Sequence, residues 1–101
     1  MVELTYNKIL ASENSKKAFI FFHGWKGNKY SFKNLPSVLN VKNIDWYFPE
    51  GPYSAENNVD EKSWAYQSSP GVYEIKETKQ LLDDFINNHI LTKYKLENVY
   101  I

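Results

Sequence analysis

The sequence predicts an α/β fold, in which a mostly parallel sheet carries helices on its faces. The first observation is an apolar run, residues 18–22, that follows Lys17 and ends at His23-Gly24. A short run that is apolar on both faces is typical of a buried strand in a parallel sheet. The second is the predicted order strand, strand, helix, strand, helix, strand. Such alternation favours parallel strands joined by right-handed crossovers.

The first two strands are expected near the N-terminal end. Residues 3–10 alternate partly between polar and apolar side chains and predict a strand near a sheet edge. A polar turn over residues 11–17 follows, and the central strand runs from Lys17 to His23. Gly24 and Gly27 then bracket a tight loop, where glycine allows close approach of the backbone. Ligands bind at the C-terminal ends of strands in open α/β sheets, so this loop is a candidate site.

The middle of the chain predicts a short helix, a strand and a long loop. Ser31 is expected to cap a helix. That helix should cover Phe32, Leu35, Val38 and Leu39. Residues 44–48 predict a second buried strand, which Pro49 ends. Residues 49–69 are expected to be a long loop, and such a loop in a compact domain is usually functional or flexible.

The last third predicts a long helix and a final strand. Ser69-Pro70 has the pattern of a cap followed by a first helical proline, so a helix is expected from residue 71 or 72 to about 91. Its buried face is predicted to hold Ile75, Thr78, Leu82, Phe85, Ile86 and His89. The strand at Asn98–Ile101 carries no charge or proline that would blunt a sheet edge.

Composition narrows the functional class. The formal net charge is zero and all twelve basic residues are lysines scattered along the chain, so nucleic-acid binding is not expected. The absence of cysteine excludes a disulfide framework, a thiolate metal site and a cysteine nucleophile. No metal-ligand spacing occurs, since no second histidine accompanies the carboxylates at Asp45, Glu50, Asp60 and Glu61. Residues 1–4 lack a signal-peptide pattern and no apolar run approaches a membrane span, so a soluble cytoplasmic protein is expected.

Several short motifs occur in a characteristic order along the chain. They are Phe21-Phe22-His23-Gly24-Trp25, then Phe48-Pro49-Glu50-Gly51-Pro52, then Ser63-Trp64, a long helix, and Asn98-Val99-Tyr100-Ile101. Together they resemble the N-terminal half of an α/β-hydrolase of the phospholipase/carboxylesterase group, which includes acyl-protein thioesterase-like enzymes. The resemblance covers the chain from about Lys17 onward. It implies a single, incomplete domain over residues 1–101 with a partial α/β-hydrolase fold, acting on carboxylic or thio esters without a cofactor.

The resemblance also implies what the chain lacks. In that family a nucleophile elbow, Gly-x-Ser-x-Gly, directly follows the strand that here ends at Ile101. No serine of this sequence lies in such a context. The chain alone is therefore expected to be inactive, and the intact enzyme would take a small-molecule or acyl ester substrate.

Site residues follow from the same resemblance. Acyl transfer needs an oxyanion hole, and one donor is expected to be the backbone N–H of Trp25, with His23 and Gly24 shaping the loop. The alternative for Trp25 is an exposed loop aromatic without a role. His23 could instead act as a general base with Asp45 or Glu50, but no nucleophile is identifiable beside it.

Two further hypotheses stay open. Trp64 and Tyr66 are expected to line an acyl or aromatic pocket, or else to pack the long loop onto the sheet. The alternative for the whole chain is a non-catalytic α/β domain. It would complete its sheet through Asn98–Ile101, by self-association into a homo-oligomer or by binding a partner chain.

Overall fold

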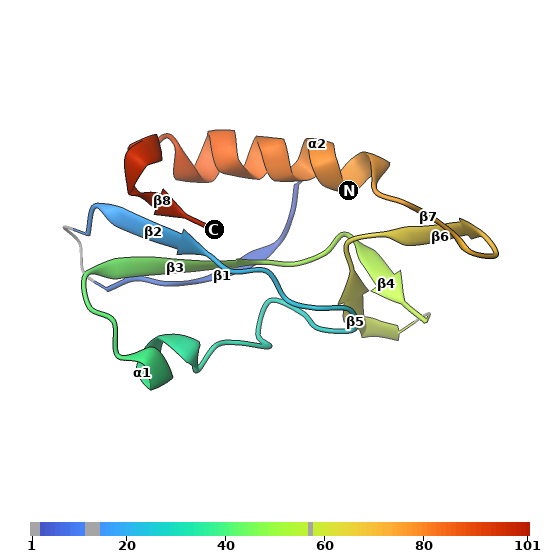
Figure 1. The fold of residues 1–101 in the computed structure, drawn as a ribbon, viewed down its shortest axis with the longest axis horizontal. Coiled ribbons are helices and arrows are strands. Elements are labelled where there is room, and N and C mark those ends of the chain that lie inside the picture. The colour runs from blue at the N-terminus through green and yellow to red at the C-terminus, as the bar shows by residue number, and fades with distance from the viewer. Residues whose placement is uncertain (1–2, 12–14, 57) are drawn as a thin grey trace.

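A four-stranded sheet forms the centre of the molecule in a computed structural model that describes residues 3–11, 15–56 and 58–101 (Figure 1). Its strand order is β1-β3-β2-β8. The strands are β1 (Tyr6–Ile9), β2 (Lys17–Ile20), β3 (Ile44–Pro49) and β8 (Val99–Tyr100). Strand β1 is antiparallel to β3, whereas β2 is parallel to both β3 and β8. The edge position expected for the first strand is confirmed. Residues 12–14, the middle of the expected polar turn, lie outside the described residues.

Two hairpins occupy most of the expected long loop, residues 49–69, and the expected start of the helix that follows it. The first joins β4 (Tyr53–Ala55) to β5 (Asn58–Ser63), and the second joins β6 (Tyr66–Ser69) to β7 (Val72–Glu74). Pro70-Gly71 forms the tip of the second hairpin, where Gly71 has a φ of 75°. Proline followed by a positive-φ glycine is a strong turn signal. That turn is why the helix expected from residue 71 or 72 begins only at Lys76.

The prediction of a mostly parallel α/β sheet with helices on its faces, as a partial α/β-hydrolase fold, is wrong for this chain. Among the described residues, the antiparallel pairings are β1–β3, β4–β5 and β6–β7, and only β2–β3 and β2–β8 are parallel. Four of the eight strands found in the described residues lie in two small separate sheets. Tight turns such as Pro70-Gly71 join consecutive strands into antiparallel hairpins. Parallel strands would need a long crossover connection instead.

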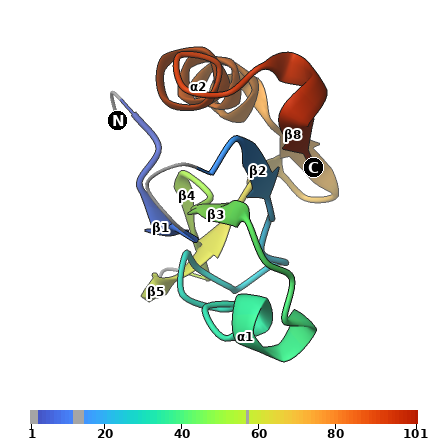
Figure 2. The same ribbon diagram turned by 90° about the vertical axis from the view of Figure 1, so that its left-hand side faces the viewer.

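Helix α2 (Lys76–Phe85) covers one face of the four-stranded sheet (Figure 2). It continues as a π-helical turn, η1 (Ile86–Ile90), in which Leu91 N–H donates to Ile86 O. The extra residue of a π-turn rotates the residues that follow it. Ile90, the last residue of this turn, is fully buried. Ile75, expected on the buried face, precedes α2 and is 56% exposed. The core under α2 consists of Leu4, Ala18, Ile20, Tyr47, Leu81, Phe85, Ile90 and Tyr94.

Aromatic side chains cover the opposite face of the sheet. Phe19 stacks on Trp46 with ring centroids 4.9 Å apart, and Phe32 meets Phe21 edge to face at 4.9 Å. Helix α1 (Leu35–Leu39) lies on this side but buries none of its residues, and Val38 is 75% exposed. This helix is shorter than expected and begins after Ser31. The Ser31 hydroxyl accepts the Asn28 N–H instead of capping the helix.

A buried polar network joins both ends of the chain to β3. The Asp45 side chain is fully buried; one of its oxygens accepts the Ala11 N–H at 2.9 Å, and the other accepts the Tyr94 hydroxyl. The hydroxyls of Tyr47 and Tyr94 lie 2.9 Å apart. Burial, and then the hydrogen bond to Asp45, raise the pKa of Tyr94 well above its ordinary value. Across the described ranges, no helix is both long and apolar enough to cross a membrane.

Candidate functional site

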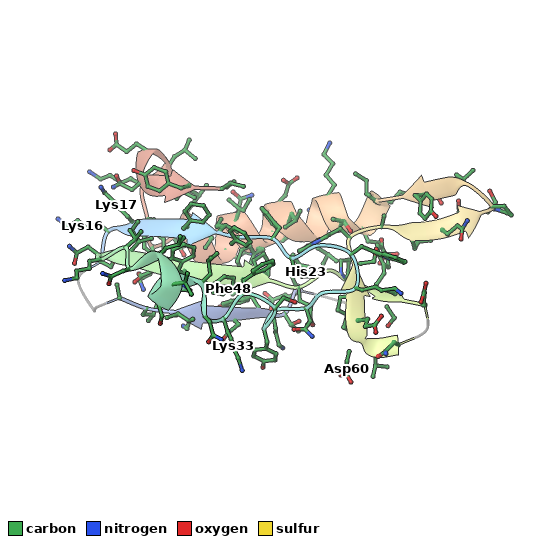
Figure 3. The ribbon with its side chains drawn as sticks, turned by 60° about the horizontal axis from the view of Figure 1, so that its bottom comes forward. Lys16, Lys17, His23, Lys33, Phe48 and Asp60 are labelled. Carbon is green, nitrogen blue, oxygen red and sulfur yellow. The ribbon has the colours of Figure 1, made fainter. Side chains whose placement is uncertain are left out.

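His23 lies just beyond the end of β2, on the side of the sheet toward the β4–β5 hairpin (Figure 3). Its ring is buried, at 5% exposure. Nδ1 lies 2.6 Å from the Gly24 carbonyl oxygen, and Nε2 accepts the Gly51 N–H at 2.9 Å. A carbonyl can only accept and an amide N–H can only donate, so the proton sits on Nδ1 and the ring is neutral. His23 thus ties its own loop to the chain just after β3.

The carboxylates proposed as partners of His23 have other contacts. The Glu50 carboxylate accepts the Thr5 hydroxyl at 2.9 Å and the Lys29 N–H at 3.2 Å. Asp45 belongs to the buried tyrosine network. Both ring nitrogens of His23 are already engaged with backbone groups. The structure therefore brings neither carboxylate into hydrogen-bond contact with the imidazole, and this geometry favours support of the loop.

Trp64 packs directly on His23. Its indole N–H donates to the His23 carbonyl at 3.0 Å, and the two rings stack with centroids 5.0 Å apart. Gly51 makes this packing possible, because a Cβ there would lie 2.4 Å from the Ser63 carbonyl oxygen. Only glycine fits so close an approach of two backbones.

The loop after His23 is held by two backbone hydrogen bonds to Lys62. Lys26 N–H donates to Lys62 O at 2.9 Å, and Lys62 N–H donates to Gly27 O at 2.8 Å. Lys26 has a φ of 70°, and its ammonium lies 2.9 Å from the Glu56 carboxylate. The hydrogen bond to Glu56 raises the pKa of Lys26. The loop is therefore pinned to β5.

Trp25 stands at the outer end of this loop. Its side chain is 65% exposed. Among the described residues, its backbone N–H donates to no protein acceptor. A Cβ on the preceding Gly24 would meet nothing within 4 Å. The loop thus leaves the Trp25 N–H without an acceptor among the described residues, in a residue that is mostly exposed.

An open pocket of about 240 Å³ lies between the end of β2 and helix α2. It is lined by Phe22, His23, Trp64, Thr78 and Leu82. The Thr78 hydroxyl donates to the Trp64 carbonyl, so its polar atom already has a partner. The pocket is therefore mostly apolar in character, and an apolar group would fill it without leaving a buried polar atom unpaired.

Tyr66 lies apart from this pocket. Its hydroxyl donates to the Glu74 carboxylate at 2.9 Å within the β6–β7 hairpin, and its ring packs on Tyr53. The bond to Tyr66 and the neighbouring ammonium of Lys76 lower the pKa of Glu74, and the bond to Glu74 raises the pKa of Tyr66. Tyr66 is not among the pocket residues.

Of the predicted site residues, the structure brings together His23, Gly24 and Trp64, with Trp25 next in the chain. Sequence reasoning did not assign Phe22, Thr78 or Leu82 to a pocket. The spacing of four between Thr78 and Leu82 places them on the same helix face, and this is the sequence signal that links them. The role of Gly51 is not predictable from the sequence, because close backbone approach between distant segments leaves no pattern in one sequence.

Within the described ranges, no three histidine, aspartate or glutamate side chains are grouped so that they could hold a metal ion. No protein-family model matches the chain, and no curated protein matches its sequence.

Proposed function

We propose that this chain is the N-terminal part of a serine hydrolase acting on carboxylic or thio esters, and that it contributes the oxyanion-hole loop. The observation that carries the proposal is the open backbone N–H of Trp25, which has no acceptor among the described residues. Hydrogen-bond donors fixed in advance at the developing negative charge supply much of the rate enhancement in acyl transfer.

Rigidity of the loop supports this role. An oxyanion donor is effective because it does not reorganise during the reaction. Here the loop is anchored by the reciprocal backbone bonds of Lys26 and Gly27 with Lys62, and by the two hydrogen bonds of the His23 ring. These contacts hold the residues on both sides of Trp25. In this proposal His23 and Gly24 support the loop that carries the Trp25 N–H.

The apolar pocket supports an ester with an apolar acyl group. Phe22, Trp64 and Leu82 give it hydrocarbon walls, and its volume is about 240 Å³. An apolar cavity of about 150 Å³ already holds benzene in another protein, so a short acyl chain or a phenyl ring fits by volume. Trp64 is the predicted substrate-binding residue that contributes to it.

The nucleophile is the part that this sequence does not supply, since none of its serines lies in a Gly-x-Ser-x-Gly context. The proposal therefore makes two predictions. The 101-residue chain alone should not react with a fluorophosphonate probe. The coding DNA read past codon 101 should continue in frame into a nucleophile elbow.

The decisive experiment uses the polypeptide encoded by that uninterrupted frame. Trp25→Pro removes the N–H, whereas the matched variant Trp25→Ala keeps it. We expect Trp25→Pro to lower kcat for p-nitrophenyl butyrate by about 10²- to 10³-fold with little change in KM. Trp25→Ala should retain kcat within a few-fold. Equal kcat values in two folded variants, serine labelling of the 101-residue chain, or a stop codon after Ile101 would each overturn the proposal.

A second candidate function is a non-catalytic domain that self-associates through Asn98–Ile101. Within the part of the chain that the structure describes, strand β8 pairs with β2 alone, and Ile101 beside it is 73% exposed. An unpaired, uncharged edge is a template for strand addition. Sedimentation over a dilution series tests this candidate, with Tyr100→Pro as the blocking variant. A monomer at every concentration contradicts it.

The cytoplasmic location stays a prediction that cell fractionation would check.

A further inference from the structure

Residues 29–42, which we call the α1 surface, carry positive charge and no carboxylate. They form the loop before α1, the helix itself and the turn into β3, on the side of the sheet opposite α2 (Figure 2). Their charged side chains are Lys29, Lys33 and Lys42. No aspartate or glutamate occurs from residue 15 to residue 44. The charge is thus unevenly distributed, and this segment is locally positive in a chain whose formal net charge is zero.

The ammonium groups of the α1 surface have no acidic partner among the described residues. Lys33 and Lys42 are exposed, and Lys29 is half-buried. The lysines that form ion pairs in the described ranges are Lys26, Lys76 and Lys93. The Glu50 carboxylate does contact this surface, but it accepts the backbone N–H of Lys29 and not the side chain. The positive charges are therefore available to an external anion.

Apolar side chains of the α1 surface are exposed beside the lysines. Helix α1 buries none of its residues. The exposed large apolar side chains of this surface are Tyr30, Phe32, Val38, Leu39 and Val41. The Lys29 ammonium lies 5.5 Å from the centre of the Tyr30 ring. Covering these groups removes apolar area from water, which is favourable. A partner that suits this surface therefore accepts ammonium groups and apolar side chains together.

We propose that the α1 surface binds the interface of a membrane that contains anionic lipids. The lysines contact the headgroups, and Val38 and Leu39 enter the boundary between headgroups and acyl chains. Tyr30 suits the same depth, because its ring is apolar and its hydroxyl is polar. The contact is peripheral, and the inference is independent of the proposed ester hydrolysis.

The composition of the surface favours a lipid interface over a nucleic acid. Aliphatic side chains such as Val38, Leu39 and Val41 gain from contact with acyl chains, whereas single-stranded nucleic acids are bound by stacking on aromatic rings. The chain has no arginine, the residue that forms bidentate contacts with phosphates and bases. Lysine acts as a compact point charge, which is sufficient for the attraction to an anionic lipid surface.

The test measures co-sedimentation of the polypeptide encoded by the uninterrupted reading frame with sucrose-loaded vesicles. Vesicles made of equal parts of phosphatidylserine and phosphatidylcholine should bind it, and vesicles of pure phosphatidylcholine should not. A salt concentration of about 1 M reduces the screening length to about 3 Å, so it should release the protein from the anionic vesicles.

Matched variants locate the contact. Lys33→Gln and Lys42→Gln should each lower the partition coefficient about fivefold. The control Lys79→Gln makes the same charge change on α2, on the other side of the sheet, and should have little effect. Val38→Thr should lower binding a few-fold, because it replaces a methyl group with a hydroxyl group at the interface. Val72→Thr makes the same change at an exposed valine of β7 and should leave binding unchanged.

Four results would overturn the inference. The first is equal binding to anionic and neutral vesicles. The second is an equal loss in Lys33→Gln and Lys79→Gln, which assigns the attraction to net charge and not to this surface. The third is binding by the 101-residue chain but not by a longer encoded polypeptide, which shows that further residues cover the surface. The fourth is retention of duplex DNA or polyglutamate without vesicle binding, which assigns the lysines to another anion.

Discussion

The Gly51 N–H donates a 2.9 Å hydrogen bond to Nε2 of His23, which joins the chain just beyond two neighbouring parallel strands. His23 follows β2 and Gly51 follows β3. Because Gly51 also lies against the Ser63 backbone, this bond fixes three segments at the mouth of the candidate site.

Replacing Gly51 by alanine should destabilise the fold strongly. The new Cβ would lie 2.4 Å from the Ser63 carbonyl oxygen, so the backbones must separate. We expect a loss of about 1–3 kcal/mol in the free energy of unfolding, measured with urea. Gly24→Ala is the control, because a Cβ there meets nothing within 4 Å and the change should be within about 1 kcal/mol. Equal losses in both variants would contradict this account.

The His23 ring should stabilise the folded state through Nε2, which accepts the Gly51 N–H. His23→Leu leaves the buried Gly51 N–H without a partner, which costs about 1–3 kcal/mol. His23→Gln offers a carbonyl oxygen near the former Nε2 position and should recover part of that loss. Urea unfolding gives the free energies, and hydrogen exchange at Gly51 reports the bond itself. If the glutamine variant is no more stable than the leucine variant, the bond to Gly51 is not the stabilising contact.

The stability of the chain should fall at alkaline pH through Tyr94. Burial and the bond to Asp45 raise the pKa of this phenol in the folded state above its ordinary value of about 10. Below that pH, Tyr94 is protonated in both states and its contribution is complete. Above it, the unfolded phenol ionises while the folded one stays protonated, so the free energy of unfolding decreases with rising pH.

Tyr94→Phe isolates this contribution from that of the other tyrosines. The variant should be less stable than the natural chain by about 1–3 kcal/mol at neutral pH, because the Asp45 carboxylate loses a donor. The gap should narrow by up to about 1.4 kcal/mol per pH unit above pH 10. Urea unfolding between about pH 8 and about pH 11 measures it. A gap independent of pH would show that Tyr94 does not titrate differently in the two states.

Two isoleucines test the helix register. Ile90 is fully buried at the end of the π-turn, whereas Ile75 precedes α2 and is mostly exposed. Ile90→Ala should therefore cost about 2–5 kcal/mol, and Ile75→Ala should change the unfolding free energy by about 0.5 kcal/mol or less. The opposite ranking would support the register that the sequence alone predicts, in which Ile75 belongs to the buried face.

The sequence was sufficient for the strands of the central sheet and for the presence of a helix before the last strand. Apolar runs such as residues 18–22 and 44–48 identify buried strands because their pattern is local. The hairpins were missed because β5 and β6 are largely polar, and Ser69-Pro70 suggested a helix start. Pro70-Gly71 instead forms the turn of the β6–β7 hairpin. The π-turn at η1 likewise has no clear sequence signal.

The candidate site was predictable only in part. His23-Gly24 at the end of an apolar strand identified the loop, and Trp64 was expected to line a pocket. The stacking of Trp64 on His23 and the contact of Gly51 with Ser63 join residues that are far apart in the chain. Tyr66 looked equivalent to Trp64 in sequence, yet it pairs with Glu74 inside its own hairpin.

The buried Asp45 carboxylate also determines how cooperatively the chain folds. Its partners Ala11 and Tyr94 are separated from it by 34 and 49 positions, toward opposite ends of the sequence. An intermediate that buries β3 without either end leaves the Asp45 side chain buried without these hydrogen-bond donors, which is unfavourable. Partly folded forms are therefore unstable until both Ala11 and Tyr94 contact Asp45. Folding should approach an all-or-none transition, at a rate limited by these distant contacts.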